Sequence, residues 1–404
     1  MPWLGLASII LAAPARAETP SLDEIWAIVQ QQQEEIALLK EQLREADAQL
    51  AVADQRIEAT GDYLDTLVAP PALPQTRIAG YGELHYNNLN ANDSARDLDQ
   101  IDFHRFVLFF GNEFTDRIRF FSELELEHSL AGDGAPGEIE LEQAYIDFTL
   151  SDSYSTRAGL FLLPLGTVNE THEPTTFYGV ERNSVESVII PTTWWEAGAA
   201  MSGRYGNGLS WDVAMHSGLA IPTSGPNAFR VRSGRQKVAE ALASDAAYTL
   251  RLRYSGMPGL DLGVSYQYQT DASQIGGDGL DAGQLFAANV AYNIGGLSLK
   301  GQYANWRFSG SAVEAAGADN QTGWYLEPSY RFSTSLGDWG FYTRYEDVKG
   351  ARTQDQFTQN EIGLNYWPID KVVFKFDYRQ RDHDLASDVG RDFDGIDIGL
   401  GYQF

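Results

Sequence analysis

The 404-residue sequence contains no cysteine, and no stretch reaches the roughly 20 apolar residues that a membrane-spanning helix needs. The first absence excludes a disulfide framework and thiolate metal sites. Basic residues are scarce: 29 Lys and Arg stand against 56 Asp and Glu, which gives a net charge of −27. That balance argues against a nucleic-acid partner, because phosphate backbones require basic patches. Because no stretch is long enough for a membrane-spanning helix, any membrane-spanning part of the chain must consist of strands.

The N-terminal segment has the pattern of an export signal. Residues 4–13 are an apolar run, and Ala15-Arg16-Ala17 follows as a cleavage site of small residues. We therefore expect residues 1–17 to be a signal peptide that is removed after Ala17. A buried N-terminal helix is the alternative.

Residues 18–68 carry a seven-residue repeat of aliphatic side chains. The repeated positions are Leu22, Val29, Ile36, Leu43, Leu50, Ile57 and Leu64. A seven-residue period predicts an α-helical coiled coil, and one such helix cannot bury its apolar seam alone, so the pattern implies association. The alternative is a helix that packs back on its own chain. Three prolines in residues 69–75 end the helix and predict a stiff linker.

From residue 76 to residue 404 the period changes from seven to two. In residues 259–271, for example, apolar or aromatic side chains alternate with polar or small ones. Such alternation predicts strands with one apolar and one polar face, and charges, Gly and Ser on the polar face suit a wet lumen. A soluble sandwich is the alternative, because its strands alternate in the same way.

The connections between these strands alternate in length, which favours a membrane barrel. Short links are expected near 114–117, 151–153, 205–208, 256–259, 294–296 and 368–370, and longer links near 88–100, 129–137, 164–193, 219–245, 271–283, 309–321, 348–357 and 382–392. We expect an all-β transmembrane barrel of about 16 antiparallel strands, preceded by the α-helical coiled coil. The strand near 78–86 should pair with the strand near 394–404, because an open edge would leave backbone groups unsatisfied in lipid.

Three segments carry a resemblance to a known family: Gly399–Phe404, Gly159–Gly166 and Ile189–Gly198. With them the chain resembles the phosphate-selective porins O and P over about 330 residues, and its coiled coil is similar to that of the trimeric DcaP-like porins. The resemblance implies a trimer, a third loop folded into the channel and, in some members, anion preference. Phosphate-specific members line the pore with a dense basic ladder; this acidic chain departs from that pattern, so phosphate specificity is not expected.

The third long link, 164–193, is the one expected to constrict the lumen. A pore selects by its diameter and by the charges at its narrowest ring. The constriction candidates are Glu170, His172, Glu173, Glu181, Arg182 and Glu186. Carboxylates there, facing wall arginines, would create a transverse field. The alternative is an ordinary surface loop with solvated charges.

Basic side chains are also expected on the lumen face of the strands. A charge on the lipid face costs about 2–4 kcal/mol at the midplane, so inward placement is the safer assignment. The candidates are Arg105, Arg157, Arg204, Arg251, Arg253, Arg331, Arg344, Lys375 and Arg379. The alternative is that these residues pair with acidic lumen residues across neighbouring strands. The fourth long link carries a basic cluster: Arg230, Arg232, Arg235 and Lys237. One hypothesis is that it attracts anionic solutes or binds lipopolysaccharide phosphates. The alternative is a solvated loop.

The functional expectation is passive diffusion of small hydrophilic solutes through a water-filled barrel, with a preference for anions. The expected location is the bacterial outer membrane, with lipid and lipopolysaccharide as surroundings, a homotrimer as assembly and the coil in the periplasm. No enzymatic activity, cofactor or metal site is expected, because the histidines show no metal-binding spacing and the His-Ser neighbours point to opposite faces of a strand. The alternative function is a structural tether between the outer membrane and the periplasm.

Overall fold

A computed structural model describes residues 76–404, and the expected signal peptide, coiled coil and linker lie outside these residues. The described chain forms one closed antiparallel barrel in which each strand pairs with its sequence neighbours and β1 pairs with β16. The sequence-based expectation of a sixteen-stranded closed barrel is confirmed. No helix in this part of the chain is both long and apolar enough to cross a membrane.

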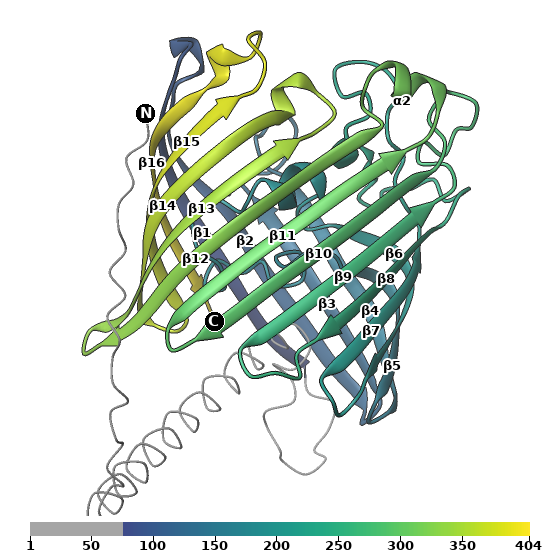
Figure 1. The fold of residues 1–404 in the computed structure, drawn as a ribbon. Coiled ribbons are helices and arrows are strands. Elements are labelled where there is room, and N and C mark those ends of the chain that lie inside the picture. The colour runs from purple at the N-terminus through teal and green to yellow at the C-terminus, as the bar shows by residue number, and fades with distance from the viewer. Residues whose placement is uncertain (1–75) are drawn as a thin grey trace, which may run out of the picture. The chain divides into compact units, whose positions relative to one another are not determined.

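The strands are long and tilted against the barrel axis (Figure 1). Their bounds are β1 Thr76–Ala91, β2 Leu98–Thr115, β3 Ile118–Glu127, β4 Ile139–Ser151, β5 Tyr154–Leu162, β6 Trp195–Arg204, β7 Leu209–His216, β8 Ala247–Tyr254, β9 Leu260–Gln269, β10 Gly283–Ile294, β11 Leu297–Phe308, β12 Asn320–Thr334, β13 Gly337–Lys349, β14 Gln356–Ile369, β15 Val372–His383 and β16 Phe393–Gln403.

Short and long connections lie at opposite ends of the barrel (Figure 1). One end has links of two to five residues, including a turn at 335–336 that the residue pattern does not predict. The other end, called the long-loop end, carries the longer links and the short helical segments. These segments are η1 Ser94–Arg96, the π-helix η2 Val185–Ile189, η3 Val231–Gly234, α2 Ser311–Ala315, η4 Thr353–Asp355 and η5 Val389–Arg391.

The two faces of the strands separate as the period of two predicts. On β9, Leu262, Val264 and Tyr266 are exposed on the outer face, whereas the alternating Ser265 and Gln267 are buried inside. Because the outer surface is apolar and aromatic along the strands, it suits contact with lipid.

The closing pair also follows the expectation. The register of β1 with β16 runs from Tyr81 opposite Gln403 to Ala91 opposite Phe393, and the Phe404 amide adds a hydrogen bond to the Gly80 carbonyl at 2.9 Å. Closure leaves no strand edge exposed to lipid.

Candidate functional site

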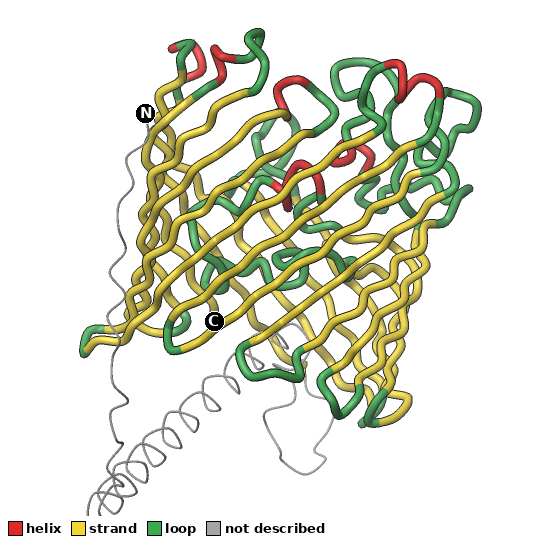
Figure 2. Tube along the Cα trace, in the orientation of Figure 1, coloured by secondary structure: helices red, strands yellow, loops and turns green. Residues whose placement is uncertain are grey.

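The connection between β5 and β6, residues 163–194, lies inside the barrel and is called the inserted loop. It is the third connection at the long-loop end, and Figure 2 shows loop and helical segments within the ring of strands. Most of its residues are buried, although connections of this length usually run over a protein surface. Its contacts with the wall therefore determine what space remains for solutes.

Arg344 on β13 is the most heavily bonded anchor of the inserted loop. Its guanidinium donates to two backbone carbonyls of the loop, Tyr178 at 3.3 Å and Glu181 at 3.2 Å. The same group donates to three wall carboxylates at 2.6–3.0 Å: Glu327, Glu346 and Glu361. All five guanidinium N–H groups are thereby used. Arg344 thus serves the architecture of the loop rather than presenting a free charge to solutes.

Strand β15 also holds the backbone of the same stretch. The Lys375 ammonium on β15 donates to the Gly179 carbonyl at 2.7 Å, and the Val180 amide donates to Asp377 at 2.7 Å. Gly179 has φ +86°, and a Cβ there would lie 2.5 Å from a Glu361 carboxylate oxygen. This position therefore requires glycine, because the backbone passes close to the wall in a left-handed conformation.

The wall beyond β16 and β1 also binds the inserted loop. Arg105 on β2 pairs with Glu83 and donates to the Tyr81 hydroxyl at 3.1 Å and to the His172 carbonyl at 2.7 Å. The His172 ring lies 3.2 Å from a Glu123 carboxylate oxygen on β3. Since the loop leaves β5, enters β6 and is bound by β13 and β15 on the far side of the ring, it crosses the lumen.

A large apolar cluster lies inside the barrel, where a polar lumen was expected. Trp306 and Phe308 on β11 belong to it, and the Trp306 indole donates to the Ile189 carbonyl of the inserted loop at 2.9 Å. Loop residues in the cluster include Leu163, Leu165, Val185, Ile189, Ile190, Trp194, Leu219, Ile221, Phe229 and Val231. Burying each large apolar side chain contributes about 1.5–3 kcal/mol. The cluster therefore fixes residues 163–194 and 217–246 against the inner face of strands from β4 to β14.

The six constriction candidates divide into two groups of three. Glu170, Glu181 and Arg182 are only half-buried, whereas His172, Glu173 and Glu186 are buried and do not face the lumen water. Glu186 accepts hydrogen bonds from the Val168 amide at 3.1 Å and from the Asn183 side chain at 3.0 Å. The buried three hold the loop in shape, so the expectation that all six face the pore is wrong for them.

The electrostatics of the loop carboxylates follow this division. Burial raises the pKa of Glu173 and of Glu186 above the usual range. Burial would also raise the pKa of Glu181, but the facing His85, 3.3 Å away, holds it well below its usual range. Glu170 forms an ion pair with Arg251 on β8. Glu181 and Glu170 are therefore the carboxylates that this loop presents to the lumen, Glu181 facing His85 and Glu170 facing Arg251.

The nine basic wall candidates lie on inward-facing positions of their strands. Arg204, near the short-turn end, is exposed, and Arg157 lies over the Tyr145 ring at 5.0 Å. Six of the nine are paired with carboxylates: Arg105, Arg251, Arg253, Arg331, Arg344 and Arg379. Lys375 binds the loop carbonyl described above. Pairing across the wall, the alternative weighed from the sequence, describes these six better than a free basic ladder.

A second group of arginines, here called the loop arginines, comprises Arg182, Arg232 and Arg235. Arg182 donates to the Thr193 hydroxyl at 2.8 Å, and Arg235 donates to the Thr193 carbonyl at 2.9 Å, so residues 217–246 meet the end of the inserted loop here. Burial, together with the charges of Arg235 and Arg230, lowers the pKa of Arg232 to about 10. Arg232 and Arg235 therefore lie close to each other, within reach of the carboxylates of Glu127 and Glu140.

Comparisons with known proteins agree with this geometry. The family model of the phosphate-selective porins O and P matches residues 78–404. An uncharacterised protein of Aquifex aeolicus (strain VF5) is 30% identical over 354 residues, which cover 77% of either chain.

Solved structures of similar fold include three porins or channels. The anion-selective porin of Comamonas acidovorans has a TM-score of 0.54 and 10% identity, with 82% of this chain and all of that chain covered. OmpF of Salmonella typhi, in complex with daunomycin, has a TM-score of 0.56 and 15% identity, with 81% of this chain and 97% of that chain covered. DcaP of Acinetobacter baumannii has a TM-score of 0.53 and 11% identity, with 82% of this chain and 97% of that chain covered. At these identities the likeness concerns the fold. Because the family model spans the whole barrel, the chain belongs to the phosphate-selective porin O and P family and is an outer-membrane porin.

Proposed function

We propose that this porin passes small hydrophilic solutes by passive diffusion and prefers anions. The observation that carries the preference is the group of loop arginines, which are half-buried where residues 217–246 meet the inserted loop. Cationic side chains along the path of a solute raise the local concentration of anions and disfavour cations. The anion-selective porin of similar fold has the same polarity of selection, but at 10% identity it adds no residue to the argument.

Selectivity for phosphate is not part of the proposal. A phosphate-selective wall needs cations whose N–H groups remain available to the anion. In this barrel Arg344 gives all its donors to carboxylates and loop carbonyls, and Arg253 pairs with Asp261 at 2.7 Å. Arginines engaged in this way do not form the free basic wall that selectivity for phosphate requires.

The assembly and the N-terminal segment belong to the same proposal. We infer that residues 18–68, after removal of residues 1–17, form a periplasmic coiled coil that joins barrels into a homotrimer in a lipopolysaccharide-containing membrane. The heptad repeat supports this, because its aliphatic seam needs partner helices. Light scattering of the mature protein should give three chains per particle, and removal of residues 18–68 should weaken the assembly. A monomer in both cases would refute the trimer.

The decisive measurement for selectivity is the reversal potential in a planar bilayer under a KCl gradient. We expect a reversal potential whose sign shows that chloride is more permeant than potassium. In Arg232→Gln the reversal potential should shift toward the value for a potassium-selective pore. A unit charge at roughly 8 Å is worth about 0.5 kcal/mol in water and acts with opposite sign on the two ions, so the permeability ratio should change about two- to fivefold at moderate salt.

The matched control is Arg117→Gln, an exposed arginine in a short turn. It should leave the potential unchanged. A wild-type potential on the cation side, or equal shifts in the two variants, would remove the loop arginines as the origin of selectivity. If a folded barrel gave no conductance at all, diffusion itself would be excluded and the tether would become the better function.

A further inference from the structure

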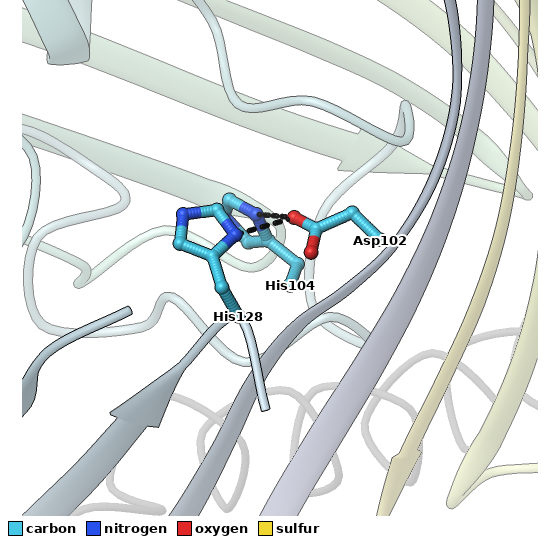
Figure 3. Close-up of side chains that lie close together, drawn as sticks. All are labelled: Asp102, His104 and His128. Carbon is cyan, nitrogen blue, oxygen red and sulfur yellow. Dashed lines mark hydrogen bonds and ion pairs between the residues drawn. The ribbon is translucent and has the colours of Figure 1, made fainter. Parts of the chain in front are cut away.

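A cluster of two histidines and one carboxylate faces the lumen near the long-loop end. Asp102 and His104 lie on β2, and His128 follows the end of β3. One Asp102 oxygen lies 2.8 Å from Nδ1 of His128 and 3.5 Å from Nδ1 of His104, and Figure 3 shows both rings turned toward this carboxylate. One ligand atom from each residue lies within 4.8 Å of the other two. This spacing approaches that of ligands around one metal ion.

Two irregularities of the backbone bring these side chains together. The pairing of β1 with β2 shifts register between Glu83 and His85, and the resulting bulge lies at His104. The alternation of β3 places Glu127 opposite the inward Arg105, so a regular strand would turn His128 outward. Instead His128 has φ +51°, and its ring meets the inward Asp102. Bulges at barrel rims commonly re-aim a side chain, and left-handed non-glycine residues cluster at functional sites.

The cluster is also accessible. The side chains of His104, His128 and Asp102 are 37%, 32% and 15% exposed. His104 stacks on His85 at 4.6 Å between ring centroids, and His85 in turn contacts Glu83 at 3.4 Å. His104 is thus held in orientation by neighbours that leave its ring nitrogen free to face Asp102. An ion in the lumen water can reach the three ligand atoms.

We propose that Asp102, His104 and His128 form a binding site for a divalent transition-metal ion, with Zn²⁺ as the best fit. Imidazole nitrogen with one carboxylate oxygen is a donor set of zinc, at distances of about 2.0–2.2 Å in a tetrahedral arrangement. Three protein ligands leave the fourth position to water. Hard cations such as Mg²⁺ and Ca²⁺ prefer oxygen ligands alone, so the two imidazoles disfavour them.

A second group, Glu123, Glu142 and His172, has similar spacing but lacks these properties. It is buried, and both ring nitrogens of His172 are engaged, one with the Asn169 carbonyl at 3.0 Å and the other with Glu123 at 3.2 Å. These contacts belong to the anchoring of the inserted loop. The accessible cluster is therefore the one assigned to a metal.

The test is zinc binding by the full-length, tag-free protein, folded in detergent and freed of metal with a chelator. Calorimetric titration with ZnCl₂ should show one ion per chain. His104→Ala and His128→Ala should each weaken binding roughly 100-fold or more, since loss of a mere outer-shell partner already costs 10–100-fold. His383→Ala is the matched control, because His383 pairs with Asp392 outside the cluster. It should bind zinc as the wild type does.

Asp102→Asn tests the site even if the histidine variants misfold, because it keeps the shape of the side chain and removes the charged ligand. Folding of every variant is checked by the electrophoretic shift of barrels on heating. With Co²⁺ in place of zinc, the wild type should give the visible absorption of a tetrahedral ion and Asp102→Asn should lose it. Absence of saturable zinc binding in the wild type, or wild-type affinity in folded His104→Ala and His128→Ala, would overturn the proposal. The binding test does not depend on conductance, so it stands apart from the proposed diffusion function.

Discussion

Replacement of Arg344 by methionine tests whether the wall holds the inserted loop. The substitution removes the cation shared by Glu327, Glu346 and Glu361, together with two hydrogen bonds to loop carbonyls. Breaking a buried ion pair by removing one partner costs about 3–5 kcal/mol. At about 1.4 kcal/mol per tenfold, the loop should leave its place roughly 10²- to 4 × 10³-fold more often.

The assay is single-channel recording combined with thermal unfolding of the barrel. Arg344→Met should show frequent transitions to higher conductance and a lower unfolding temperature. The control is Arg331→Met, whose partner Asp338 lies 2.9 Å away in a water-accessible pair worth about 0–1 kcal/mol. Adding Glu361→Gln to Arg344→Met should restore part of the stability, because it removes one of the repelling carboxylates. If Arg344→Met behaved like Arg331→Met, the assigned role of Arg344 would be refuted.

Two further perturbations probe the lumen. Glu181→Gln should move the reversal potential further toward anions, and by an equal amount at pH 7 and pH 5, because His85 opposes the effect of burial and keeps the pKa of Glu181 well below its usual range. A shift at pH 7 that vanished at pH 5 would contradict the ionised state of this carboxylate at the lower pH. Trp306→Ala should lower the free energy of unfolding by about 3–5 kcal/mol, because it leaves a cavity in the internal apolar cluster. Trp324→Ala, on the outer face, serves as its control; an equal loss in heat stability would show that the internal cluster contributes nothing special.

The barrel was predictable from the sequence because its signal is local. Alternation along residues 259–271 and the spacing of links fixed the strand faces, the even strand number and the closing pair. The turn at 335–336 escaped because Ser335-Leu336 contains neither the Asp nor the Gly that each of the other short links contains. The position of residues 164–193 in the order of links identified the inserted loop.

The side-chain contacts inside the lumen were not predictable, because they depend on long-range register. From the sequence, Glu186 is interpreted as a charge facing the pore or the solvent. Only the fold shows that it is buried and accepts hydrogen bonds from backbone amides. The His128 ring faces inward because His128 itself has a left-handed backbone conformation, which the residue pattern does not predict. One signal was available for the apolar cluster: Val188-Ile189-Ile190 lies within a long link, and such a run is costly to leave in water.

The wall binds the backbone of the inserted loop, which leaves the loop side chains open to change. Between Tyr178 and Glu181 the wall forms hydrogen bonds with main-chain atoms: three carbonyls and the Val180 amide. Every residue type other than proline supplies these groups, so apart from Gly179 the attachment does not depend on which side chains the loop carries. Position 181 can then change from acid to amide or base while the loop stays in place. Charge preference and mechanical support are separated within one four-residue stretch, and a pore built this way can acquire a new permeant by single substitutions without a loss of fold.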